Sequence, residues 1–212
     1  MADSSRPSSQ PDFWDVRYER EDHLFGTGPD AFVRSEAHRL PPGSDVVELG
    51  AGEGRTCAWL AHEQGHTTTA VDFSDEALST ARDWASAHDL PLGTIRADVR
   101  TWRPGRQWDA AVVTFLQLLP DERPRLYRLL RRIVRPGGWV LAEWFRPDHL
   151  TGEYERIGPS SPDRMVPLEE VRSAFEDDTL VKCVPVDVFL EEGPLLNGPA
   201  AVVRAAVRIQ ED

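Results

Sequence analysis

The chain has 212 residues, a length that one hydrophobic core can serve, and no change in composition divides it. It carries 24 basic and 36 acidic residues, so its formal net charge is -12. This charge disfavours nucleic acid and an anionic membrane surface as partners. No apolar stretch approaches the roughly 20 residues that a transmembrane helix needs. We therefore expect neither a nucleic-acid partner nor a membrane partner.

The N-terminal residues predict a short tail followed by one domain. Residues 1–11 are mostly Ser, Pro and small polar residues that cannot bury apolar area, so we expect a disordered tail. The start has neither the basic nor the apolar region of a signal peptide, and only two cysteines occur, which favours a cytoplasmic protein. Residues 12–212 form the expected single domain, and residues 12–42 form its helical cover, which ends at Pro41 and Pro42.

From residue 45 onward, short apolar runs alternate with amphipathic helices. The expected strands have the sequences DVVELG, TTTAVD, GTIRAD, WDAAVVTF and GGWVLAEWF. Helices are expected over residues 55–64 and 74–88 and around the apolar positions from Leu126 to Ile133. Strands separated by helices make βαβ units, so the pattern predicts a mainly parallel sheet.

The end of the chain predicts two more strands. Residues 183–190 and 203–210 both alternate apolar and other side chains, and the turn between them has no room for a helix, so they should pair antiparallel. Pro185 cannot donate a hydrogen bond to a neighbouring strand, which favours the sheet edge for the first of them. Residues 147–162 are rich in Pro, Gly and Ser and long for a connection, so we expect a lid or a disordered segment there.

The segment VVELGAGEGR, residues 46–55, predicts a ligand site. A buried strand leads into three glycines and then a helix, a turn that lets the backbone approach a ligand closely. The third glycine, Gly54, comes one position earlier than in the dinucleotide pattern, which argues against a nicotinamide-dependent oxidoreductase. Glu48 and Glu53 would repel a pyrophosphate but suit a cationic cofactor such as S-adenosylmethionine. A tight turn without a ligand is the remaining alternative.

ELGAGEG resembles the first motif of class I S-adenosylmethionine-dependent methyltransferases. Later motifs over residues 45–145 resemble the family in the same order: Asp72 matches its ribose-binding acid, Asp98 its adenine-contacting acid, and Arg135 begins its RPGG turn. With the element order, this resemblance implies an α/β fold with a Rossmann-like, doubly wound seven-stranded sheet, mainly parallel with an antiparallel C-terminal strand pair. The implied cofactor site contains Glu48, Gly50, Ala51, Gly52, Gly54, Asp72, Phe73, Asp98, Val99 and Thr114.

A narrower resemblance covers both ends of the chain. Residues 13–33 and 191–203 are similar to the entry segment and closing hairpin of bacterial tellurite-resistance and thiopurine-type methyltransferases. Trp14 and Tyr18 are then expected to fold over the cofactor, where aromatic faces attract a sulfonium, although simple packing is an equal alternative. Gln117 stands where that group commonly has a histidine, which leaves the acceptor open.

These observations predict in-line methyl transfer to a small molecule that is a soft or anionic nucleophile, such as a thiol, a selenol or a tellurite-like ion. One alternative acceptor is a hydroxyl, amine or carboxylate of a metabolite, deprotonated by His149 or another base. Another alternative is a catalytically silent sensor that binds S-adenosylmethionine. No catalytic residue is assigned beyond the candidates His149 and Gln117, no metal is expected from the histidine spacing, and the protein should be a monomer or homodimer. The candidates for acceptor contacts are Phe25, Phe115, Gln117, Trp144 and Arg146.

Overall fold

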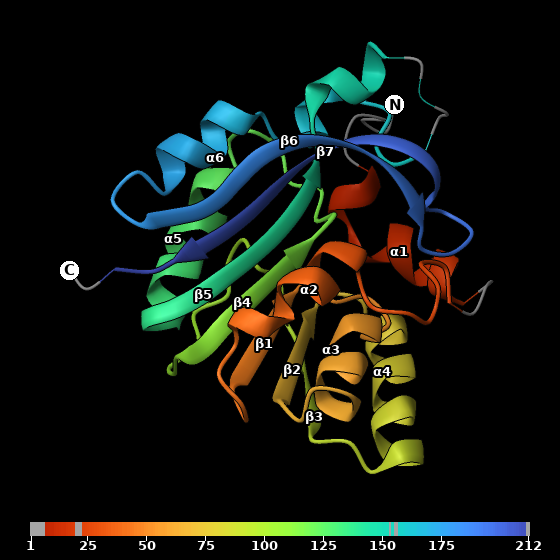
Figure 1. Cartoon of the computed structure of the whole chain (residues 1–212). Coiled ribbons are helices and arrows are strands. Elements are labelled where there is room, and N and C mark those ends of the chain that lie inside the picture. The colour runs from red at the N-terminus through yellow and green to blue at the C-terminus, as the bar shows by residue number, and fades with distance from the viewer. Residues whose placement is uncertain (1–6, 20–22, 153, 155–156, 211–212) are drawn as a thin grey trace.

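The computed structural model describes residues 7–19, 23–152, 154 and 157–210, and it contains one seven-stranded sheet (Figure 1). The strand order is β3-β2-β1-β4-β5-β7-β6. β1 to β5 run parallel, whereas β7 lies antiparallel between β5 and β6. The strands are β1 (Asp45–Leu49), β2 (Thr67–Asp72), β3 (Leu92–Arg96), β4 (Trp108–Thr114), β5 (Val134–Phe145), β6 (Thr179–Glu191) and β7 (Asn197–Arg208). The predicted fold class is therefore confirmed.

Helices cover both faces of this sheet (Figure 1). The helices α2, α3 and α4 lie on one face, and α5 and α6 lie on the other. The α-helices are α1 (Pro11–Tyr18), α2 (Ala31–Glu36), α3 (Arg55–His62), α4 (Asp75–His88), α5 (Arg123–Ile133) and α6 (Leu168–Ala174). Short 3-10 helices are η1 (Pro7–Ser9), η2 (Ala37–Arg39), η3 (Pro147–Leu150) and η4 (Pro162–Arg164). No helix in the described part of the chain has the length and hydropathy that crossing a membrane requires.

Burial on both faces explains the apolar runs of the central strands. In β4, Ala111 and Val113 pack towards α5, while Ala110 and Val112 pack against the cluster formed with α2 and α3. All four side chains are fully buried. A strand covered on both faces needs a continuous apolar sequence rather than an alternating one, as the run after Asp109 shows.

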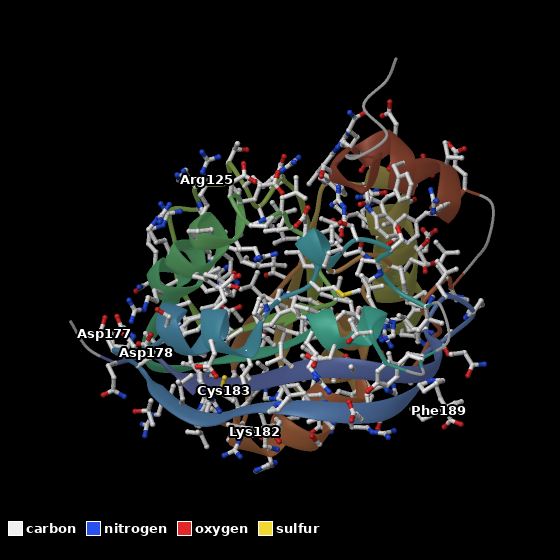
Figure 2. The ribbon with its side chains drawn as sticks, turned by 90° about the horizontal axis from the view of Figure 1, so that it is seen from above. Arg125, Asp177, Asp178, Lys182, Cys183 and Phe189 are labelled. Carbon is white, nitrogen blue, oxygen red and sulfur yellow. The ribbon has the colours of Figure 1, made fainter. Side chains whose placement is uncertain are left out.

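The edge strand β6 carries Pro185, as predicted from the sequence. Figure 2 shows Lys182, Cys183 and Phe189 along this strand, and Phe189 is 60% exposed. β6 extends beyond the predicted residues 183–190 at both ends, whereas β7 begins before residue 203 and ends before residue 210. The two strands pair from Thr179 with Arg208 to Glu191 with Asn197. This long hairpin brings the loop between its strands to the carboxyl end of the parallel strands.

The N-terminal region differs from the prediction in one respect. Of the predicted tail, residues 1–6 lie outside the described residues, but residues 7–11 belong to η1 and the start of α1. Contacts distant in sequence hold this segment, since the backbone oxygen of Ser9 accepts a hydrogen bond from Arg100 and its hydroxyl accepts one from Arg164. Composition alone could not predict these contacts.

Candidate functional site

A cavity of about 810 Å³ opens at the carboxyl ends of the parallel strands. Ligands of open α/β sheets bind at this edge, and the volume lies in the upper part of the range of about 300 to 1,000 Å³ for small-molecule sites. Its walls come from the glycine loop after β1, from α1, from residues 157–164 and from the tip of the β6–β7 hairpin at residues 194–196.

The glycine loop is held by Asp72 at the end of β2. The backbone N–H of Gly52 donates to Asp72 Oδ2 at 2.9 Å, and the N–H of Ser74 donates to Oδ1 at 2.9 Å. Gly52 has φ +55°, and a Cβ there would lie 2.8 Å from the hydroxyl oxygen of Tyr18. Burial raises the pKa of Asp72 although backbone N–H groups oppose the shift. Asp72 therefore shapes the loop and also lines the cavity.

Gly54 has a packing role. Its φ is +74°, and a Cβ there would lie 2.8 Å from the Cβ of Ala81 in α4. Only glycine allows the loop to pack this closely against α4. Gly54 is not among the described residues that line the cavity, unlike the neighbouring Gly50, Ala51 and Gly52.

Glu48 presents a buried carboxylate to the cavity. It is 3% exposed, and its Oε2 accepts no hydrogen bond from the described residues. Burial raises the pKa of Glu48 to about 7, against the opposing effects of Cys57 and Arg55. A buried carboxylate oxygen without a donor is costly, so a cationic ligand at this position would stabilise it.

Asp98 also lines the cavity, after the end of β3. The guanidinium of Arg100 binds both of its carboxylate oxygens, with Nη2 2.6 Å from Oδ2. Burial opposes ionisation, but hydrogen bonds from Arg100 lower the pKa of Asp98 below its usual value. Arg100 also donates to Glu122 and to the backbone of Ser9, so Asp98 anchors the residue that holds the N-terminal segment in place.

One side of α1 covers the cavity with Phe13, Trp14, Arg17 and Tyr18. The ring centroid of Trp14 lies 6.1 Å from that of Tyr18 and 6.2 Å from that of Phe25. The guanidinium carbon of Arg17 lies 3.4 Å from the centroid of Phe13, and Nη1 donates to the backbone oxygen of Phe13. Among the described residues, no carboxylate forms an ion pair with Arg17.

Aromatic and aliphatic groups dominate the part of the cavity beyond the glycine loop. Phe115 follows β4 with φ +54°, a strained value for a bulky residue, and its N–H donates to the backbone oxygen of Glu143 at 2.8 Å. Its ring centroid lies 5.2 Å from that of Phe145. Gln117 lies on the same wall, and its backbone oxygen accepts a hydrogen bond from Arg164.

The structure brings most predicted site residues to the cavity. The predicted residues found there are Trp14, Tyr18, Phe25, Glu48, Gly50, Ala51, Gly52, Asp72, Phe73, Asp98, Val99, Thr114, Phe115 and Gln117. Arg100 and Arg164 lacked a sequence signal, because they reach the cavity through long-range folding, whereas residues 157–161 of its wall fall in the segment predicted as a lid or disordered. Arg17 could have been found from its spacing of four residues after Phe13 on a helix.

Three predicted acceptor-side residues are absent from the described lining. Trp144 is 2% exposed and packs in the core beside Tyr127, on the sheet face opposite Phe145. Arg146 forms ion pairs with Asp148 and Asp187.

The third, His149, is 4% exposed, and both of its ring nitrogens have backbone partners. Nδ1 accepts from the N–H of Ala201 at 3.2 Å, which leaves Nε2 to donate to the oxygen of Ile157 at 2.8 Å. No acceptor reaches this ring without breaking one of these bonds. His149 is therefore a structural residue of the 147–162 segment, and a mobile lid there stays a prediction.

Residues 46–138 match the family model described as a methyltransferase domain. This match covers the glycine loop, both strand-end acids and the parallel strands, and the rest of the sheet has the predicted antiparallel pair. Over these residues the chain is similar to methyltransferase domains. This match and the sheet topology agree with the predicted resemblance to methyltransferases. No group of three or more His, Cys, Asp or Glu in the described part of the chain is arranged to hold a metal ion.

Three comparisons place this chain among known proteins. The malonyl-[acyl-carrier protein] O-methyltransferase of Salmonella typhimurium is 34% identical over 100 residues, which are 46% of this chain and 37% of the relative. TehB from Haemophilus influenzae has a TM-score of 0.72 at 16% identity, covering 94% of this chain and 67% of that one. A structure from work on the conversion of a disulfide bond into a thioacetal group during echinomycin biosynthesis has a TM-score of 0.75 at 20% identity, covering 94% and 93%. The chain spans 36% to 58% of the length of the curated relatives it matches.

Proposed function

We propose that this chain transfers the methyl group of S-adenosylmethionine to a small-molecule acceptor that is a soft or already deprotonated nucleophile. The observation that carries the proposal is the composition of the cavity wall. It offers the unpartnered Oε2 of Glu48 and the guanidinium of Arg17, which has no carboxylate partner among the described residues, and none of the described lining residues is His, Cys or Lys.

The polar groups of the cavity fit the charges of this cofactor. The unpartnered oxygen of Glu48 would hold the amino group, and Arg17 would hold the carboxylate of the same amino-acid end. Asp72 would accept hydrogen bonds from the ribose hydroxyls, and the rings of Trp14 and Tyr18 would attract the sulfonium. A pyrophosphate would instead meet the carboxylates of Glu48 and Asp72.

When bound, the cofactor supplies an electrophilic methyl group and a neutral thioether leaving group. An acceptor that attacks this methyl group directly would need no nucleophile from the protein. The chain contributes alignment and exclusion of water. The acceptor would lie next to the glycine loop, among the apolar side chains of Phe25, Phe115 and Phe145.

The protonation chemistry of the wall favours an acceptor that ionises by itself. Burial, and next the charge of Asp72, raise the pKa of Tyr18 well above 10.0, so its phenol is a poor base. Asp98 is bound by Arg100, and Glu48 and Asp72 have the cofactor contacts proposed above. A thiol, a selenol or an oxyanion needs no positioned base, unlike an alcohol or an ammonium group.

The test is a screen for S-adenosylhomocysteine formation with thiols, selenols, tellurite, phenols, amines and carboxylates. We expect turnover with the soft or anionic compounds, and loss of turnover in the matched Asp72→Ala variant. Turnover with amines or alcohols alone would contradict the proposed acceptor class. Binding of the cofactor without turnover of any compound would indicate the silent sensor instead.

A further inference from the structure

Glu192 directly follows β6 and connects three segments that are distant in sequence. It is 6% exposed. Its Oε2 accepts a hydrogen bond from Nη2 of Arg55 at 2.5 Å, and its Oε1 accepts one from the backbone N–H of Ala31 at 3.0 Å. One carboxylate thus joins the hairpin to the start of α2 and to the start of α3.

Arg55 connects this carboxylate to the glycine loop. It is the first residue of α3, directly after Gly54, and its side chain lines the cavity. Nη1 donates to the backbone oxygen of Gly28 at 3.0 Å. The side chains of Arg55 and Glu192 are 10% and 5% exposed, so solvent screens their interaction little.

The hairpin tip beyond Glu192 forms part of the cavity wall. The backbone N–H of Glu192 donates to the backbone oxygen of Leu196 at 2.9 Å, and the N–H of Leu195 donates to the backbone oxygen of Leu24 at 3.2 Å. A Cβ at Gly193 would lie 2.1 Å from the backbone nitrogen of Gly26, so the two backbones are in direct contact. The tip is therefore packed directly against residues 24–26.

We propose that Glu192 is a positioning residue that couples cofactor binding at the glycine loop to the acceptor wall formed by Phe25 and residues 194–196. This inference rests on the proposed function, because it takes S-adenosylmethionine as the ligand of the loop. Ordering of the loop fixes Arg55, Arg55 fixes Glu192, and Glu192 fixes the wall. Binding of cofactor thereby prepares the surface that receives the acceptor.

Amide hydrogen exchange tests this coupling with S-adenosylhomocysteine as the probe. In the wild type the probe should slow exchange both in the loop, at Gly52, and in the tip, at Leu195. In Glu192→Gln the loop should still be protected by the probe, whereas its effect on Leu195 should be lost. A coupling free energy of ordinary size would slow amide exchange at Leu195 by about 5-fold to 150-fold in the wild type. Glu169→Gln is the matched control, since Glu169 pairs with Arg172 at the surface.

The outcomes separate this inference from the proposed function. Protection of Leu195 in Glu192→Gln equal to that in the wild type would overturn the coupling, as would a wild-type tip that does not respond. No protection of Gly52 in the wild type would overturn the proposed function and the coupling with it. A purely structural role would change exchange with and without the probe alike.

Arg55→Gln and the double variant provide a second measurement should Glu192→Gln fail to fold. Arg55→Gln should also remove the effect of the probe on Leu195, and adding Glu192→Gln should change nothing more. Additive losses in the double variant would contradict transmission through this ion pair.

Discussion

Glu143 on β5 lies directly opposite Arg204 on β7, and its Oε1 accepts a hydrogen bond from Nε of Arg204 at 3.1 Å and lies 3.1 Å from Nη2 in an ion pair. Glu143 is fully buried, and its Oε2 accepts no hydrogen bond from the described residues. Burial, and next the charge of Asp30, raise the pKa of Glu143 to about 9. The raised pKa predicts that the carboxyl group keeps its proton at neutral pH, despite its arginine neighbour.

This protonation makes stability depend on pH. The folded-state pKa of Glu143 exceeds its ordinary value of 4.5. Proton binding to Glu143 therefore stabilises the folded state fully below about pH 4.5, and this stabilisation is lost as the pH rises towards about 9. We expect Glu143→Gln to flatten the fall in unfolding free energy, which for one proton is at most about 1.4 kcal/mol per pH unit. Urea unfolding from pH 5.5 to 9 measures it, with exposed Glu76→Gln as the control. An unchanged slope would mean that Glu143 is ionised. Some slope should remain, since burial also raises the pKa of Glu48 to about 7 and that of Asp30 to about 6.

Asp72→Ala should weaken the binding of S-adenosylhomocysteine by about 10-fold to 150-fold, because it removes charged hydrogen bonds worth about 1.5 to 3 kcal/mol. The same change leaves the N–H groups of Gly52 and Ser74 without their acceptor, so we also expect a loss of stability of about 1 to 3 kcal/mol. Calorimetry and thermal unfolding measure the two effects. Full affinity in a folded Asp72→Ala protein would mean that Asp72 supports the glycine loop and does not bind the cofactor.

The cofactor half of the site could be predicted because its residues lie in contiguous motifs at strand ends. A strand, a glycine turn and a helix N-terminus are encoded locally, so Gly52 and the acid of the next strand, Asp72, necessarily meet at the sheet edge. The paired strands at the end of the chain could be predicted equally well, since Pro185 restricts its strand to an edge of the sheet.

The acceptor half could not be predicted in the same way. Alternation along β5 separates Trp144 from Phe145, but the sequence does not state which face borders the cavity. His149 is polar and follows a strand end, yet its two hydrogen-bond partners come from residues 8 and 52 positions away. Arg164 and Ser9 meet only because the chain folds back across the cavity, at a separation of 155 residues. Such contacts depend on tertiary packing, which local pattern does not encode.

Arg17→Gln should lower affinity for S-adenosylhomocysteine by about 10-fold or more, since a charged hydrogen bond contributes about 1.5 to 3 kcal/mol. Affinity for 5′-methylthioadenosine, which lacks the amino-acid end, should not change. Arg34→Gln is the matched control, because Arg34 is exposed on α2 away from the cavity. Equal losses for both ligands would show that Arg17 supports α1 rather than binding a carboxylate.

With a thiol acceptor, kcat/KM should rise with pH along the acceptor's own ionisation, whose unperturbed midpoint is about 8.5 for a cysteine-like thiol. His149→Ala should leave the maximal rate nearly unchanged, since both ring nitrogens are already engaged by backbone groups. It should cost about 1 to 3 kcal/mol of stability, because the buried N–H of Ala201 loses its acceptor. An enzymic base would contribute about 10²-fold to 10⁴-fold, so a loss of that size in folded His149→Ala protein would contradict the absence of a base. Gln117 lines the cavity, so in Gln117→Ala we expect the KM of the acceptor to rise while the midpoint of the pH profile stays the same.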